Sequence, residues 1–205
     1  MRRSLVLLFS LLLLAAVAAD APEKGGKAPL KPGNNLPGPF YPYNVTGPHK
    51  GHFHSFVSEH GLGPAVLVFH RGLEVSDAFK DLLKQLDTAL EKNVRANLAG
   101  YVVFIAEDLP EVFGVNDKDD DRREELAAKL DDLAKALMLK HVAVCLDSKS
   151  DVEKYGLGDE AVTVVLYRKL QILASHSLTR NQVTEARIKE IMGEVAEKLG
   201  AKRKK

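Results

Sequence analysis

Histidine is the residue whose distribution in this chain first points to chemistry. Five of the seven histidines lie between residues 49 and 70, namely His49, His52, His54, His60 and His70. Imidazole nitrogen binds zinc, copper and nickel, and three or four protein ligands complete such a site. His52 and His54 are two positions apart, so they would point to the same side of an extended segment. His49 and His60 could join them if the chain turns back at residues 61–64.

Two interpretations of the first four histidines remain open. One is a site for zinc or copper formed by His49, His52, His54 and His60. The other is a set of surface histidines in an aromatic, turn-rich segment that precedes a buried strand. Their spacing matches no standard structural zinc motif, and no cysteine accompanies them. The second interpretation is therefore favoured, and no cofactor is expected.

The fifth histidine has a different setting, at the end of a predicted strand. The run PAVLVFH (64–70) is continuously apolar, which is typical of a strand covered on both faces. Open α/β sheets place their binding sites beyond the carboxyl ends of parallel strands. His70 and Arg71 could therefore line a cleft together with Glu74, and both are candidates for a catalytic role.

Cys145 is the single cysteine, so the chain can form no disulfide within itself. It lies in the apolar run VAVCLD (142–147), where a cysteine acts as a small buried hydrophobe. It is also the one residue that could supply a catalytic thiolate. Burial is the favoured interpretation, and Cys145 is kept as a third catalytic candidate.

The amino terminus has the pattern of a secretory signal peptide over residues 1–19. Arg2 and Arg3 precede an apolar run that is short for a membrane span, and small residues follow it. We expect an exported protein, periplasmic or secreted, with no membrane span after cleavage. Without these residues the chain has 27 basic and 28 acidic side chains, a formal charge of −1. This balance argues against nucleic acid as a partner.

Proline marks the segment that follows. Seven of the nine prolines fall within residues 20–50, which predicts a linker ahead of one domain at 51–200 and a basic tail at 201–205. The later part of this segment, FYPYNVTG (40–47), is aromatic and is expected to lie against the domain. It also contains the glycosylation sequon Asn44-Val45-Thr46.

From residue 64 the hydrophobic pattern alternates between strands and helices. Further strands are expected at 100–106, 141–147, 161–167 and 171–176, the last two as an antiparallel hairpin that turns at 168–169. Leucine stripes predict a helix capped by Ser76, a second ending near Leu137 and a third from about Thr179 to Gly200. A short helical turn is expected at 150–155. Such alternation predicts a parallel sheet core.

This order, ending in VTVVLYRKLQILAS (162–175) and an amphipathic helix, resembles the thioredoxin-like fold. The long helix before HVAVCLD is closer to the peroxiredoxin branch, of the alkyl hydroperoxide reductase type. The chain looks like exported bacterial proteins with a redoxin domain. The resemblance covers roughly residues 51–199 and rests on the order of strands. It implies an α/β fold with a central mixed sheet and helices on both faces.

The catalytic residues of these families are missing. Thioredoxins carry C-x-x-C, and peroxiredoxins a threonine and a cysteine, where this chain has RGLEVSDAF (71–79). The cis-proline of thioredoxins corresponds to Val162, before Thr163. Both reactions need a thiolate, so the resemblance implies neither at this position. Ser55 and Ser58 have C-x-x-C spacing, and are interpreted as a lost accessory thiol pair or, preferably, as polar residues on a strand that leads into the core.

Three functions follow from these observations. The favoured hypothesis is a non-catalytic binding or interaction module of redoxin ancestry, whose protein partner the sequence does not identify. The first alternative is a thiol-dependent redox enzyme, an oxidoreductase or peroxiredoxin-like protein, that uses Cys145 or the thiol of a partner. The second is a zinc- or copper-binding protein that uses the histidines at 49, 52, 54 and 60.

Overall fold

The computed structural model describes residues 30–109 and 117–200, and six strands in these residues form one sheet. The strand order across the sheet is β1-β4-β3-β2-β5-β6. The three central strands are parallel to one another: β2 (Pro64–Arg71), β3 (Ala99–Ala106) and β4 (Ala143–Ser148). The outer strands run antiparallel to their neighbours: β1 (Tyr43–Asn44), β5 (Val162–Arg168) and β6 (Gln171–Leu178). The predicted mixed sheet with a closing hairpin is confirmed.

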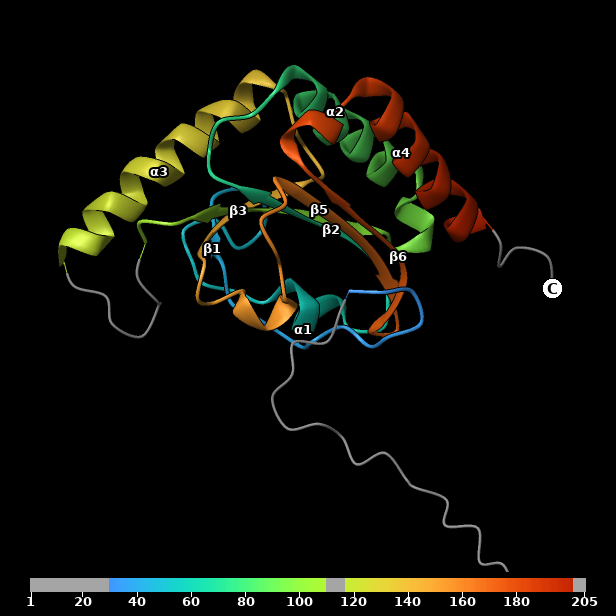
Figure 1. Ribbon diagram of the computed structural model, residues 1–205. Coiled ribbons are helices and arrows are strands. Elements are labelled where there is room, and N and C mark those ends of the chain that lie inside the picture. The colour runs from blue at the N-terminus through green and yellow to red at the C-terminus, as the bar shows by residue number, and fades with distance from the viewer. Residues whose placement is uncertain (1–29, 110–116, 201–205) are drawn as a thin grey trace, which may run out of the picture.

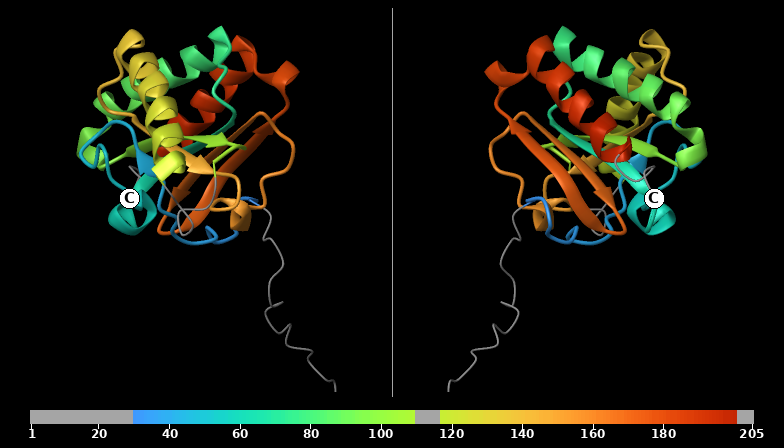
Figure 2. Two further views of the ribbon diagram at one scale, coloured as in Figure 1. Left: turned by 90° about the vertical axis from the view of Figure 1, so that its left-hand side faces the viewer. Right: turned by 90° about the vertical axis from the view of Figure 1, so that its right-hand side faces the viewer.

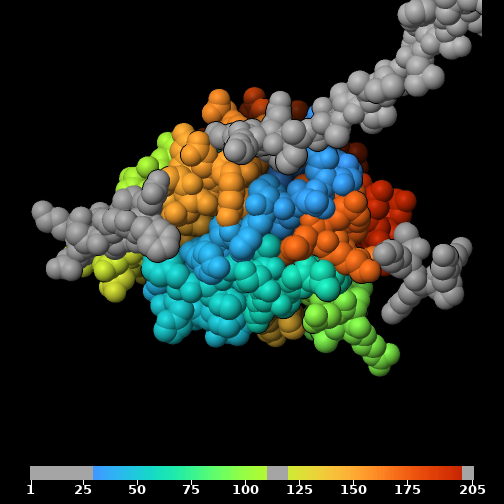
Figure 3. All heavy atoms as spheres, turned by 90° about the horizontal axis from the view of Figure 1, so that it is seen from below, coloured from blue at the N-terminus to red at the C-terminus, as the bar shows by residue number. Residues whose placement is uncertain are grey.

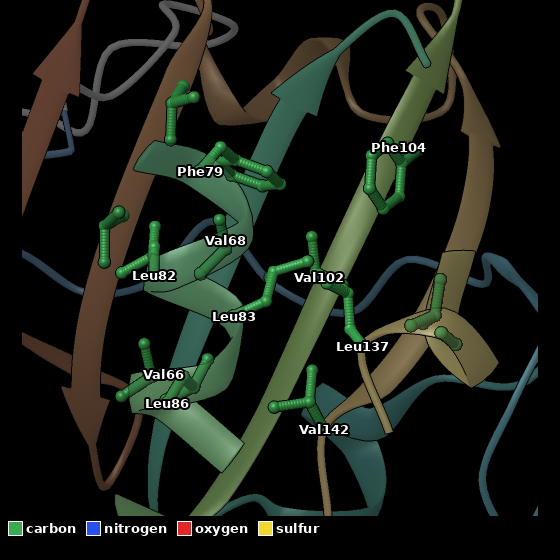
Figure 4. Packing of buried hydrophobic residues seen from close by; sticks show 14 of the residues in the cluster. Val66, Val68, Phe79, Leu82, Leu83, Leu86, Val102, Phe104, Leu137 and Val142 are labelled. Carbon is green, nitrogen blue, oxygen red and sulfur yellow. The ribbon is translucent and has the colours of Figure 1, made fainter. Parts of the chain in front are cut away.

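Three long helices cover one face of this sheet, as the perpendicular views of Figures 1 and 2 agree. They are α2 (Asp77–Lys92), α3 (Asp117–Ala136) and α4 (Glu185–Gly200). Helix α2 begins where predicted, because the Ser76 hydroxyl accepts a hydrogen bond from the N–H of Phe79 at 3.2 Å. Figure 4 shows the apolar side chains of α2 packing toward valines of β2 and β3, and the residues of this stripe are all buried: Phe79, Leu82, Leu83, Leu86 and Leu90.

Two predicted boundaries are displaced. Thr179 caps a short 3₁₀ helix, η4 (Arg180–Gln182), and α4 begins only at Glu185. The hairpin turns one residue later than predicted, since Lys169 and Leu170 both adopt positive φ between β5 and β6. The other 3₁₀ helices of the described residues are η1 (Val94–Ala96) and η3 (Glu153–Tyr155), and η3 lies within the helical turn expected at 150–155.

The opposite face of the sheet is covered by short and irregular segments. Helix α1 (Phe56–His60), η3 with the residue before it, and residues 30–42 lie there. In Figure 3, which views this face, the blue segment that starts at residue 30 lies between the cyan α1 region and orange residues near η3. The buried side chains that these segments supply are Leu36, Phe40, Phe56, Val57, Val152 and Tyr155. Helices therefore lie on both faces, as predicted. One face is covered by three long helices and the other by short helices and irregular backbone.

The described part of the predicted linker, residues 30–50, packs on the sheet, and the expectation that residues 40–47 lie against the domain is confirmed. Tyr43–Asn44 pairs with β4 as an edge strand, and Leu36 and Phe40 are buried. Backbone hydrogen bonds also join residues 33–36 to the opposite edge of the sheet, at Leu170 and Ile172. The many prolines indicated a segment without ordered packing. The segment is instead held by apolar side chains that lie between the prolines, and it needs few hydrogen bonds of the sheet type. The predicted signal peptide, residues 20–29 and the basic tail lie outside the described residues.

Asn44 fastens the irregular segment to the sheet. Its side chain is wholly buried, and its Nδ2 donates to the carbonyl oxygens of Pro42 at 3.1 Å and His52 at 2.9 Å. Its Oδ1 accepts the S–H of Cys145 at 3.4 Å. These contacts tie residues 42–52 to β4 through one amide. They also leave no room for a glycan on Asn44 in the folded protein, so the sequon is not a usable site in this fold.

We expect Asn44→Asp to lower the free energy of unfolding by about 3 kcal/mol, because a buried carboxylate would face two carbonyl oxygens that need a donor. Urea unfolding followed by circular dichroism measures this change. The matched control is Asn35→Asp, an exposed asparagine in the same segment, with an expected change within about 0.5 kcal/mol. Equal stabilities of the two variants would refute the anchoring role of Asn44.

Candidate functional site

The carboxyl edge of the parallel strands contains the first candidate site. β2 ends there at His70 and Arg71, between β3 on one side and β5 on the other. Successive side chains of a strand point to opposite faces, so His70 turns toward the three long helices and Arg71 toward η3. The predicted position of these two residues at a sheet edge is therefore confirmed, and a hollow lies on each side of them.

His70 is buried beneath the start of α2. Its ring packs against Phe79 and Phe104, with centroids 4.3 and 5.3 Å away. Its Nδ1 lies 2.8 Å from the carbonyl oxygen of Gly72, so the proton of the neutral ring resides on Nδ1 and donates to that carbonyl. Burial lowers the pKa of His70, and the nearby charge of Arg180 adds to this effect. His70 is therefore a neutral, structural side chain at physiological pH.

Arg71 holds two loops together at the same edge. Its guanidinium donates to the carboxylate of Glu107 at 3.2 Å and to the carbonyl oxygen of Gly158. Glu107 follows β3, and Gly158 follows η3, so one side chain connects the loops after two elements. The two terminal nitrogens of Arg71 thus connect loops that adjoin the hollow, while its buried Nε has no hydrogen-bond partner among the described residues.

That hollow has a volume of about 340 Å³, within the range of small-ligand pockets. Its walls combine apolar side chains with charged ones at the rim. The apolar residues are Ile105, Leu109, Val152 and Leu157, and the charged residues are Arg71, Glu107, Lys149 and Glu153. A smaller hollow of about 230 Å³ lies on the His70 side and includes Glu74 and Arg180. We refer to the larger one as the edge cleft.

No sulfur lies at this edge among the described residues. The segment from Gly72 to Ser76, which joins β2 to α2, contains no cysteine. Val162, opposite His70 in the sheet, occupies the place of the expected proline, and the described backbone contains no cis peptide bond. Cys145 lies in the middle of β4, with its side chain wholly buried. Burial, and secondarily the charge of Asp147, raise the pKa of its thiol well above the ordinary value.

The histidines before β2 form a second cluster, with a membership different from the prediction. His49 and His54 stack with ring centroids 3.6 Å apart, and both Nε2 atoms approach the carboxylate of Glu59. His52 is exposed and lies outside this group. A turn closed by the His52 N–H and the His49 carbonyl lies just before this segment, and His49, not His52, stacks on His54.

His60 and the two serines take structural positions on α1. His60 is partly buried, and its ring lies 5.8 Å from that of Tyr101. Burial lowers its pKa. Ser55 is buried and caps α1 by accepting the N–H of Ser58 at 3.4 Å. The predicted lead-in strand at these serines is therefore a short helix, and capping accounts for Ser55.

Sequence reasoning missed two acidic residues. Glu59 joins the histidine cluster, and the signal for it was an acid five residues after His54, on the same turn-rich segment. Burial acts to raise the pKa of Glu59, but hydrogen bonds from His54 and His49 outweigh it, so that the pKa is lowered. Asp147 lies within the buried run of β4, and burial followed by the charge of Asp151 raises its pKa well above the ordinary value. An acid inside a strand covered on both faces was the available signal.

Comparisons with solved structures identify this architecture. A protein from Chlorobium tepidum described as the thiol:disulfide interchange protein DsbE aligns with a TM-score of 0.55 at 13% identity, over 83% of this chain and 99% of its own. Peroxidoxin BcpB from Mycobacterium tuberculosis aligns with a TM-score of 0.51 at 13% identity, over 82% and 97%. A secreted disulfide oxidoreductase from the same organism gives 0.52 at 12% identity, over 77% and 95%. The chain has the thioredoxin-like fold.

The likeness to these thioredoxin-like structures concerns the fold alone. No family model and no curated protein sequence matches this chain. Within the described residues, no helix is both long and apolar enough to cross a membrane. The fold predicted from the order of strands is thus confirmed, as is the absence of a C-x-x-C pair from a chain with one cysteine.

The lowered pKa of His70 makes stability depend on pH. The unfolded chain binds a proton near pH 6.5, whereas folded His70 resists it, so stability falls as the pH drops below that value. We expect His70→Gln to reduce the slope of unfolding free energy between pH 7 and 5 by up to about 1.4 kcal/mol per pH unit. Urea unfolding at a series of pH values measures it. His60 contributes in the same direction, so some slope remains.

The exposed His141 provides the control for this measurement. His141→Gln should leave the slope of the wild-type protein unchanged. A His70→Gln variant that keeps the full wild-type slope would contradict the assignment of a neutral, buried imidazole.

Proposed function

We propose that this protein is an exported thioredoxin-like binding module that performs no thiol chemistry and binds a protein partner in its edge cleft. One observation carries the proposal. The fold retains a formed cleft at the edge where the strands end, while that edge has no sulfur and the single cysteine lies inside a strand.

The thiol chemistry of redoxins requires an accessible thiolate. The thiol of Cys145 is not accessible, because it is wholly buried in β4 between β3 and β1. It also does not ionise readily, because burial raises its pKa. The Ser76 hydroxyl caps α2 by accepting the N–H of Phe79. His70 has no cysteine to activate in the segment that joins β2 to α2, and burial disfavours its protonated form.

The edge cleft suits an extended peptide with one large apolar side chain. Ile105, Val152 and Leu157 supply an apolar floor, and charged groups surround its mouth. Arg71 fixes the two loops that form the walls, so the cleft exists before a ligand arrives. A preformed cleft reduces the entropy lost on binding.

Export is supported by the pattern of residues 1–19 and by the secreted disulfide oxidoreductase with the same fold. The absence of disulfides does not oppose it, because a domain of this size can be stabilised by its apolar core. The partner is therefore sought among proteins of the periplasm, the medium or a secretory lumen.

We expect the full chain to show no insulin-disulfide reduction and no peroxide consumption above a protein-free control. A thiol reagent should label native Cys145 slowly and the urea-unfolded chain rapidly, because the sulfur is enclosed. Cys145→Ala should behave as wild type in both activity assays. Turnover that is lost in Cys145→Ala would refute the non-catalytic assignment and favour the thiol-dependent alternative.

The binding role is tested with two matched leucine truncations. Peptides selected from a random library on the wild-type chain should lose about tenfold or more in affinity for Leu157→Ala, which removes part of the cleft floor. They should bind Leu62→Ala unchanged, because Leu62 is exposed and precedes β2, at the other end of that strand. Peptides that bind all three proteins equally would place recognition elsewhere and overturn the proposed cleft.

A further inference from the structure

We propose that His49, His54 and Glu59 form a binding site for a divalent transition-metal ion of the zinc type, with one coordination position left for a ligand from outside the cluster. This site lies on α1 and the loop before it, and it does not depend on the function proposed for the edge cleft.

The ligand atoms already converge on one point. The Nε2 atoms of His49 and His54 lie 3.1 and 3.0 Å from the same carboxylate oxygen of Glu59. All three ligand atoms lie within 4.8 Å of one another. Ligands about 2.0–2.2 Å from a tetrahedral zinc ion are a little more than 3 Å apart, so small rotations of these side chains would accommodate the ion.

The stacking of the two rings strengthens the case. The planes of His49 and His54 differ by 19°, and both rings direct Nε2 toward Glu59. Phe56 lies edge-on to both rings, with centroids 5.8 and 5.6 Å away, and limits their rotation. In the metal-free protein the two Nε2–H groups hydrogen-bond to the carboxylate. Binding of an ion at both Nε2 atoms requires each neutral ring to carry its single proton on Nδ1 instead.

The loop that contains the two histidines has little regular structure, but several contacts hold it against the rest of the protein. Asn44 holds its backbone at Pro42 and His52, and His54 donates its N–H to the carbonyl oxygen of Pro42 at 3.2 Å. Lys50 reaches Asp131 of α3 at 2.8 Å. The guanidinium of Arg123, also on α3, lies 5.1 Å from the centre of the Phe53 ring. None of these contacts uses a side chain of the three proposed ligands, and together they hold the loop in place before an ion binds.

The donor set decides the class of ion. Two imidazole nitrogens and one carboxylate oxygen suit zinc, nickel, copper and iron(II), and they do not suit calcium or magnesium, which prefer oxygen alone. Within residues 30–109 and 117–200 this is the one group of three such side chains that could hold a metal ion. Three protein ligands leave a position open, as in catalytic zinc sites. Because the side chains are partly exposed, water or a donor from a partner molecule can reach that position.

The test is a calorimetric titration of the full chain, produced without a histidine tag, with Zn²⁺. We expect one ion per chain. His54→Ala and Glu59→Gln should each weaken binding by about tenfold or more, and His52→Ala should bind as wild type. His52 is the matched control, because it is a histidine of the same loop that lies outside the cluster.

A second readout separates coordination from a structural role of the loop. Co²⁺ in a three-ligand protein site gives visible absorption bands, which should appear with wild type and His52→Ala and be absent with His54→Ala. Circular dichroism should show all metal-free variants folded. No Zn²⁺ binding by wild type, or binding that His54→Ala and Glu59→Gln retain, would overturn the site. Leu157→Ala should bind Zn²⁺ as wild type, so failure of the cleft and failure of the metal site are distinguishable.

Discussion

A sheet whose central strands are apolar on both sides must be shielded from water on both sides, and most of this structure follows from that requirement. β2, β3 and β4 are buried almost throughout their length. Three long helices shield one face, and residues 30–42, α1 and η3 shield the other. Because the second cover has little regular structure, its order depends on specific anchors such as Asn44 rather than on repeating backbone hydrogen bonds.

The irregular cover also determines where function can lie. It brings the histidine cluster to the surface beside α1, and it forms one wall of the edge cleft through η3 and the loop around Gly158. On the other face, helices α2, α3 and α4 pack their apolar side chains into the core. Both candidate sites, the histidine cluster and the edge cleft, are thus built from the segments with the least regular secondary structure.

Periodic features of the sequence predicted the regular half well. The stripe from Phe79 to Leu90, the cap at Ser76 and the hairpin around residue 169 follow from local rules that the folded chain obeys. The candidate sites were harder to predict, because they depend on a turn and on contacts between distant residues. His49 reaches His54 after the turn that the His52 N–H closes with the His49 carbonyl, and Glu59 joins the cluster because α1 forms. The buried position of Cys145, set by strand pattern alone, was predictable.

The attachment of residues 33–36 to Leu170 and Ile172 has a consequence for the order in which the molecule assembles. Gly33 and Gln171, which are hydrogen-bonded, are 138 residues apart in sequence. Residues 33–36 are synthesised long before the closing hairpin that contains their partners, so this attachment forms late. Contacts of this separation close slowly. The cover over one face of the sheet is therefore completed only after the last strand has been synthesised, when residues 33–36 meet the hairpin.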